Sequence, residues 1–161
     1  MKHFLLCFGL MFFFSCSQEE TPSIVTEGPS VPSPNPTPYP GPDPTQLFEE
    51  VNLARRVRGL PELTMNETLT CAALRHAWDI GPKNMCSTNG SDGSDLAQRI
   101  RGCRGAATAE IIGCNYLTAK QAVDAWTRRL DTSRILLNYN MMQMGVAEVN
   151  RHYVVVFLGM L

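Results

Sequence analysis

Residues 144–158 read Met-Gly-Val-Ala-Glu-Val-Asn-Arg-His-Tyr-Val-Val-Val-Phe-Leu and carry the strongest structural signal in the chain. Two largely apolar runs, residues 144–149 and 153–158, flank the polar turn Asn150-Arg151-His152. The second run is rich in valine and contains no charged residue, which is typical of a buried central strand. The stretch therefore predicts two antiparallel strands joined by a short turn.

Helical patterns precede these strands. Apolar residues recur with a helical period in three segments, and a short fourth helix is expected near residues 96–101. Each of the three begins at a suitable N-cap, and glycine ends two of them. The segments run from Asp43 to Gly59, from Asn66 to Gly81, and from Thr118 through Leu130. Helices first and strands last predict an α+β fold.

Length and charge exclude several classes of protein. The 161 residues suit one domain, because domains usually hold about 100–150 residues. The chain has 14 basic and 15 acidic residues, so it lacks the basic excess of an obligate nucleic-acid binder. Six cysteines are too many for a typical reduced cytosolic protein and indicate export.

Residues 1–15 have the features of a signal peptide. Residues 4–14 form an unbroken apolar run, shorter than the roughly 20 residues that a membrane span needs. The run ends in residues 13–16 (Phe-Phe-Ser-Cys), which resemble the lipobox of bacterial lipoproteins, although Phe13 stands where leucine is usual. The resemblance implies that Cys16 receives a diacylglycerol thioether, which anchors the protein to a membrane of the bacterial cell envelope. The alternative is cleavage after Ser17 and secretion.

A proline-rich linker is predicted to follow Cys16 and to end at residue 45. It holds nine of the eleven prolines and four acidic residues without a basic one. Such a segment lacks the apolar residues for a core and favours extended polyproline II. Its 29 residues could span roughly 90 Å if they serve as a spacer. A proline-rich docking ligand is the alternative, and residues 46–161 remain as the folded domain.

Six short motifs follow one another in this domain: residues 52–55 (Asn-Leu-Ala-Arg), 58–63 (Arg-Gly-Leu-Pro-Glu-Leu), 73–81 (Ala-Leu-Arg-His-Ala-Trp-Asp-Ile-Gly), 90–94 (Gly-Ser-Asp-Gly-Ser), 122–126 (Ala-Val-Asp-Ala-Trp) and 144–146 (Met-Gly-Val). In order and spacing they resemble those of CAP domains, the cysteine-rich secretory, antigen 5 and pathogenesis-related proteins, also called SCP-like. The resemblance implies an α-β-α sandwich with a central antiparallel sheet, in a secreted or surface-exposed protein.

CAP domains often carry a cleft with two histidines and two acidic residues that can bind a divalent metal. At the matching positions this chain has Thr88, Glu110, Arg129 and Thr132, so one of the four residue types is kept. Zinc needs about three or four His, Cys or carboxylate ligands, and an arginine would repel it. We therefore expect no metal and no other cofactor at this cleft. If Arg129 lies close to Glu110, it should pair with that carboxylate.

Two functions from different classes remain open. The first is a non-enzymatic, monomeric binding module on the envelope, whose partner is an apolar ligand, an envelope component or another protein. The second is an exported hydrolase with a non-metal site around Glu110 and His76. His76 shares a helix face with apolar residues, which favours a structural role, and no complete catalytic constellation is found. Six arginines at positions 55, 56, 58, 99, 101 and 104 suggest a solvated basic face or contact with anionic headgroups or wall polymers.

Four cysteines remain in the folded domain: Cys71, Cys86, Cys103 and Cys114. In an oxidising compartment they predict two disulfides, with three possible connectivities that the spacing leaves open. Pairing neighbours, Cys71 with Cys86 and Cys103 with Cys114, would close the shortest loops.

Overall fold

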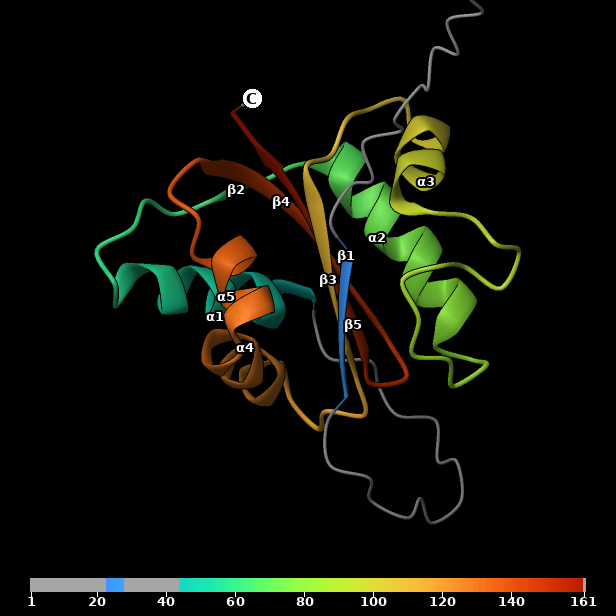
Figure 1. Ribbon diagram of the computed structural model, residues 1–161, viewed down its shortest axis with the longest axis horizontal. Helices are drawn as coiled ribbons and strands as arrows, with labels where there is room; N and C mark the ends of the chain where they lie inside the picture. Colours follow the sequence, from blue (N-terminus) through green and yellow to red (C-terminus); the bar gives the residue numbers. More distant parts are fainter. Residues whose placement is uncertain (1–22, 28–43, 161) are drawn as a thin grey trace, which may run out of the picture.

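A computed structural model describes residues 23–27 and 44–160 (Figure 1). A five-stranded sheet with the order β1-β3-β5-β4-β2 runs through the domain. Strands β3, β5 and β4 are antiparallel, whereas β1 and β2 pair in parallel with β3 and β4. The predicted hairpin is confirmed, but the sheet is mixed rather than purely antiparallel. The strands are β1 (Ser23–Glu27), β2 (Thr64–Met65), β3 (Ala109–Cys114), β4 (Met141–Val149) and β5 (His152–Gly159).

The helices largely follow the sequence patterns. Asn66 caps α2 by accepting from the backbone N–H groups of Thr68 and Leu69. The helix predicted through Leu130 is instead two helices, because Arg129 has an extended backbone with φ −92° and ψ 134°. Strand β3 and helix α5 were not predicted. The helices are α1 (Pro44–Arg56), α2 (Glu67–Ile80), α3 (Leu96–Gly102), α4 (Ala119–Arg128) and α5 (Leu130–Leu136).

Helices cover both faces of the sheet, as an α-β-α sandwich requires (Figure 1). Helices α1, α4 and α5 cover one face and α2 and α3 the other. Side chains alternate along β3, so Ile111 joins the first core and Ile112 the second. At Gly145 a Cβ atom would lie 2.0 Å from the backbone nitrogen of Thr70, so the packing of α2 on β4 requires glycine there. Among the described residues, no helix has the length and apolar character to cross a membrane.

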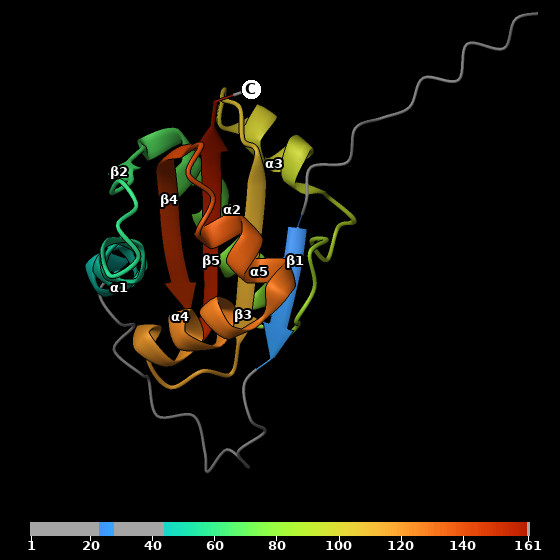
Figure 2. The ribbon, with the colours of Figure 1, turned by 60° about the vertical axis from the view of Figure 1, so that its left-hand side comes forward.

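Strand β1 corrects the predicted linker. Ser23–Glu27 lies inside the segment expected to be a spacer, yet it forms an edge strand beside β3 (Figure 2). The buried Thr26 hydroxyl donates to the Ile112 carbonyl at 3.1 Å and accepts from the Trp126 indole nitrogen at 2.6 Å. Proline content concealed this strand, because its few apolar and β-branched residues stand between polar and proline-rich stretches. The predicted signal peptide and Cys16 lie outside the described residues.

The predicted disulfides form, but the neighbouring-cysteine pairing is wrong. The bonds join Cys71 to Cys103 and Cys86 to Cys114. Cys71 lies on α2 and Cys103 caps α3, and these two helices pack against each other. Cys86 and Cys114 connect the segment after α2 to the end of β3. Packing of the helical layer, rather than loop length, selects the partners.

Candidate functional site

A buried ion pair forms the centre of the candidate site. Arg99 Nη2 donates to Glu110 Oε2 at 2.7 Å, and the two side chains are only 4% and 0% exposed. Arg99 is on α3, and Glu110 is on the side of β3 that faces α2 and α3. Glu110 therefore already has a cationic partner inside the protein.

Burial and charge act against each other at Glu110. Burial raises the pKa of Glu110 and the Arg99 guanidinium and the Ser23 hydroxyl oppose this shift, so that the pKa is about 7. A buried carboxyl group is costly to ionise unless a cation compensates it, and Arg99 provides that compensation. Arg99 therefore keeps the pKa of Glu110 lower than burial alone would make it.

Arg99 also holds the loop between α2 and α3. Its Nη1 donates to the Ser94 carbonyl at 2.7 Å, and its Nη2 donates to the Thr88 carbonyl at 3.1 Å. Asp79 of α2 fastens the same loop by accepting from the Ser91 backbone N–H and hydroxyl, both at 2.6 Å. Hydrogen bonds from Lys83 and the Ser91 hydroxyl hold the pKa of Asp79 well below its usual range. The Gly-Ser-Asp-Gly-Ser motif is thus fixed in place on both sides.

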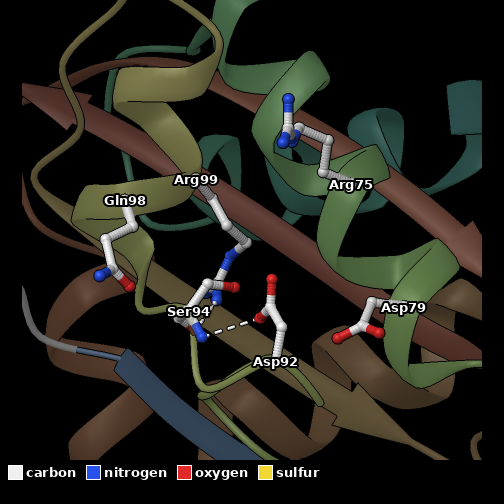
Figure 3. Close-up of a pocket in the computed structure, with 6 residues that line it drawn as sticks. All are labelled: Arg75, Asp79, Asp92, Ser94, Gln98 and Arg99. Atoms are coloured by element: carbon white, nitrogen blue, oxygen red, sulfur yellow. Dashed lines mark hydrogen bonds between the residues drawn. The ribbon is translucent and has the colours of Figure 1, made fainter.

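An open pocket of about 350 Å³ lies between α2, this loop and α3 (Figure 3). Cations and anions both line it, because Arg75 and Asp79 project from α2 while Arg99 projects from α3. Asp92 accepts from the Ser94 backbone N–H at 2.8 Å across the loop. The lining side chains are Arg75, Asp79, Asp92, Ser94, Gln98 and Arg99. The pocket suits a polar ligand better than an apolar one.

His76 lies near this pair but has no nucleophile as a partner. Its ring is fully buried, and Nε2 lies 3.0 Å from the Ser87 carbonyl oxygen. Burial, together with the charge of Arg99, lowers the pKa of His76 to about 4. Cys71, Cys86, Cys103 and Cys114 are all oxidised to disulfides. Within the described part of the chain, no Ser hydroxyl or Cys thiol is hydrogen-bonded to His76.

Only two of the four positions that match the two histidines and two acidic residues of the CAP cleft lie close together in space. The Thr88 carbonyl and the Glu110 carboxylate both bind Arg99. Thr132 lies in the core on the α4–α5 side, where its hydroxyl donates to the Trp126 carbonyl at 2.7 Å. The other two positions, Thr132 and Arg129, therefore lie in the α4–α5 layer on the opposite face of the sheet.

The pairing expected between Arg129 and Glu110 is wrong. Arg129 is exposed and pairs with Asp131 at 2.8 Å, because the break between α4 and α5 turns its side chain toward solvent. Arg99 provides the cation instead. Arg99 follows Leu96 by three residues and stands next to Ile100, and both of these residues are buried. This helical spacing was the sequence signal that could have placed Arg99 on the inner face of α3.

Two of the six arginines expected on a basic face are buried. Arg99 is one, and Arg55 is the other. The Arg55 guanidinium donates to the Pro61 and Leu136 carbonyls at 2.9 and 2.8 Å and so connects α1 with the end of α5. The motif at residues 52–55 therefore has a structural role here.

The residues at these positions do not fit a metal ion. Glu110 is bound to a guanidinium, which repels cations, and the Thr132 hydroxyl is bound to a carbonyl on the opposite face. Within residues 23–27 and 44–160, no group of three or more His, Cys, Asp or Glu side chains is placed to hold an ion.

Solved structures of bacterial proteins share this fold. An extracellular SCP-domain protein of Bacillus anthracis superposes with a TM-score of 0.67 at 21% identity, over 72% of this chain and 40% of its own. A cysteine-rich secretory protein of Staphylococcus aureus gives 0.64 at 19% identity, over 77% of this chain and 40% of its own. An outer surface protein of Borrelia burgdorferi gives 0.60 at 21% identity, over 69% and 87%. The chain thus spans about 40% of the length of the first two proteins.

Comparison with curated protein sequences finds no match. The sequence profile of the CAP, cysteine-rich secretory protein family matches residues 48–157, which is most of the chain. This chain belongs to the CAP family of cysteine-rich secretory proteins.

Proposed function

We propose that this chain is an exported CAP-family binding module without enzymatic activity. The observation that carries the proposal is the buried Arg99–Glu110 pair. A metal-binding or catalytic carboxylate must be free to bind a cation or move a proton. Here the guanidinium takes that place, and breaking the pair would leave a charge buried without a partner.

The surroundings of His76 support the same proposal over a hydrolase. A Ser–His or Cys–His centre needs the nucleophile within hydrogen-bond reach of the base. The nearest polar partner of His76 is a backbone carbonyl, and the pKa of about 4 keeps the ring neutral rather than poised for proton transfer near pH 7.

The pocket above the pair is the proposed ligand site. Arg75 and Gln98 offer donors, and Asp92 offers an acceptor. A small polar component of the cell envelope that carries both an anionic and a cationic or hydroxyl group would match this lining. We infer that such a ligand is favoured here over the apolar ligand that the sequence left open.

Calorimetric titration with zinc at neutral pH tests the central claim. The oxidised wild-type domain should show no stoichiometric binding. Micromolar one-to-one binding that disappears in Glu110→Gln but persists in Glu148→Gln would overturn the proposal and favour a metal site. Glu148 is the matched control because burial likewise raises the pKa of its carboxyl to about 7, but it lies on β4.

We further propose that the module is held on a membrane of the cell envelope through a lipid on Cys16. The sequence at residues 13–16 supports this, as does the surface location stated for the Borrelia burgdorferi protein. Two or more acyl chains on one residue give stable anchoring, at about 0.8 kcal/mol per buried CH₂ group.

A further inference from the structure

We propose that the end of the domain where β1 begins docks on the anionic headgroups of the membrane that holds Cys16. The inference rests on the anchoring proposed above and deepens it. It specifies the face of the domain that contacts the membrane and limits the distance between that face and the bilayer.

Strand β1 sets the length of chain between anchor and domain. Six residues, 17–22, separate Cys16 from Ser23, so the connection can span at most about 25 Å. Most of the prolines follow β1 and therefore connect β1 to α1, not the anchor to the domain. A domain of this size is about 35 Å across, so a 25 Å tether cannot bring its opposite end to the bilayer.

Three segments meet at the end where β1 begins, which we call the anchor end (Figures 1 and 2). Because β1 and β3 are parallel, Ser23 lies beside Glu110, near the start of β3. The Thr108 backbone N–H donates to the Phe157 carbonyl at 2.7 Å, and that of Met160 donates to the Asn140 carbonyl at 3.0 Å. Residues 101–108, 137–143 and 157–160 therefore lie side by side at this end.

The anchor end combines exposed apolar side chains with arginines. Tyr139, Met142 and Met160 are 66%, 52% and 60% exposed. Arg101 and Arg104 are exposed, and the three segments contain no acidic residue. Aromatic and flexible apolar side chains bordered by arginines are suited to the boundary between headgroups and acyl chains.

Charge at the rim of the anchor end also favours anionic lipid. The Arg75 guanidinium packs against Gly102, at 3.3 Å from where a Cβ atom would stand, and adds a third cation. Glu67 is an exposed acid in the first turn of α2 at the same end, so Arg75, Arg101 and Arg104 outnumber the acids among the described side chains there. Basic residues within a Debye length of an anionic bilayer are attracted to it.

Quenching by brominated lipids tests this orientation. The chain beginning at Cys16 is prepared without lipid and coupled through the Cys16 thiol to maleimide-phosphatidylethanolamine in vesicles of brominated phosphatidylglycerol and phosphatidylcholine. Cys71, Cys86, Cys103 and Cys114 are in disulfides, so Cys16 supplies the thiol. A tryptophan is introduced by Tyr139→Trp at the anchor end, or by Leu117→Trp as a control. Both are made in a Trp78→Phe background.

Leu117 is a matched control because it is an exposed apolar residue, 45% accessible, before α4 at the opposite end (Figure 2). Emission of the Tyr139→Trp protein should be strongly quenched and that of the Leu117→Trp protein should not. Equal quenching of both, or stronger quenching of Leu117→Trp, would overturn the inference. If the anchor end binds a protein partner instead of lipid, neither protein should be quenched, or both should be quenched equally. Either result would overturn the inference.

A charge-matched pair of variants tests the headgroup contact. Arg101→Gln with Arg104→Gln should reduce the quenching of Tyr139→Trp in phosphatidylglycerol vesicles. Lys120→Gln with Arg128→Gln removes the same charge from α4 and should not. Equal effects of the two pairs would overturn recognition of anionic headgroups. Because the coupling is chemical, absence of a lipid on Cys16 in cells would refute the anchor without altering this result.

Discussion

Arg99 is the residue on which the candidate site depends, since one guanidinium donates to an oxygen of a buried carboxylate and to two loop carbonyls. An arginine fork can donate several hydrogen bonds in one plane, which lysine cannot. The acid that this chain shares with the CAP cleft is therefore paired with a cation from the same domain.

Replacing either member of the pair should destabilise the fold. We expect Arg99→Met or Glu110→Leu alone to cost about 3–5 kcal/mol, because each leaves a buried charge without a partner. The double variant should cost clearly less than the sum of the two. Urea denaturation of the three proteins measures this coupling.

The exposed pair Arg56–Glu62, at 2.9 Å, is the control for that cycle. Its coupling, from Arg56→Met and Glu62→Leu, should stay below about 1 kcal/mol. Equal coupling energies for the two pairs would contradict the importance of burial at Arg99.

Acid should destabilise the fold through His76. Its pKa is about 4 in the folded protein against an ordinary 6.5, so the unfolded chain binds the proton more readily. The stability is present above the unfolded pKa and is lost as pH falls toward the folded pKa. Relative to His76→Gln, the free energy of unfolding of the wild type should fall by about 2 kcal/mol between about pH 7 and about pH 4.5.

Urea denaturation at the two pH values measures that difference. The comparison with His76→Gln is needed because the raised pKa of Glu110 acts in the opposite direction over part of this range. If the difference in unfolding free energy between the wild type and His76→Gln is the same at both pH values, protonation of His76 does not cause the acid destabilisation.

At the scale of elements, β1 is the piece whose contribution is least evident from its own five residues. It places a hydroxyl between the β3 backbone and the Trp126 indole. Trp126 is fully buried between α4 and the sheet, so its N–H needs an acceptor. The edge strand thus helps to hold α4 against the face of the sheet that α1, α4 and α5 cover.

Thr26→Val tests that role of β1. The substitution keeps the shape and the strand preference but leaves the Trp126 N–H without its acceptor, which should cost about 1–3 kcal/mol. Thr64→Val, at an exposed position of β2, should change the stability by less than about 0.5 kcal/mol. If thermal unfolding shows equal effects for both, β1 does not make this contact in solution.

At the scale of the whole molecule, the layers and the two disulfides join segments far apart in the chain. The bonds span 32 and 28 residues; one joins α2 to the end of α3, and the other joins the segment after α2 to β3. Closure of loops of this length contributes about 3–4 kcal/mol each in the chain-entropy model. They reinforce the layer that carries the candidate pocket.

Cys16→Ser is expected to change where the whole protein is found. Without the thiol there is no site for the diacylglycerol, so the chain should be released from membranes or remain unprocessed. Membrane fractionation with intact-mass measurement distinguishes these results, and Ser17→Ala serves as a control that keeps the thiol. A Cys16→Ser protein of mature mass that still sediments with membranes would refute lipid anchoring.

The amino-acid sequence by itself determined the features that depend on neighbours along the chain. The hairpin of β4 and β5 follows from two apolar runs around a short turn, and Asn66 caps α2 within the next three residues. The ordered CAP motifs identified the fold for the same reason, since each is a local pattern of residue types. Local periodicity is sufficient for such elements because their hydrogen bonds close within a few residues.

Only the tertiary structure decided which distant groups meet. The partner of Glu110 is Arg99 and not Arg129, the partner of Cys71 is Cys103 and not Cys86, and Ser23–Glu27 is a strand because β3 offers it an edge. None of these pairings has a local signature, since burial of a charge, contact of two helices and strand pairing are properties of the assembled layers. The physical reason is that their stabilisation arises only when elements from separate parts of the chain exclude water together.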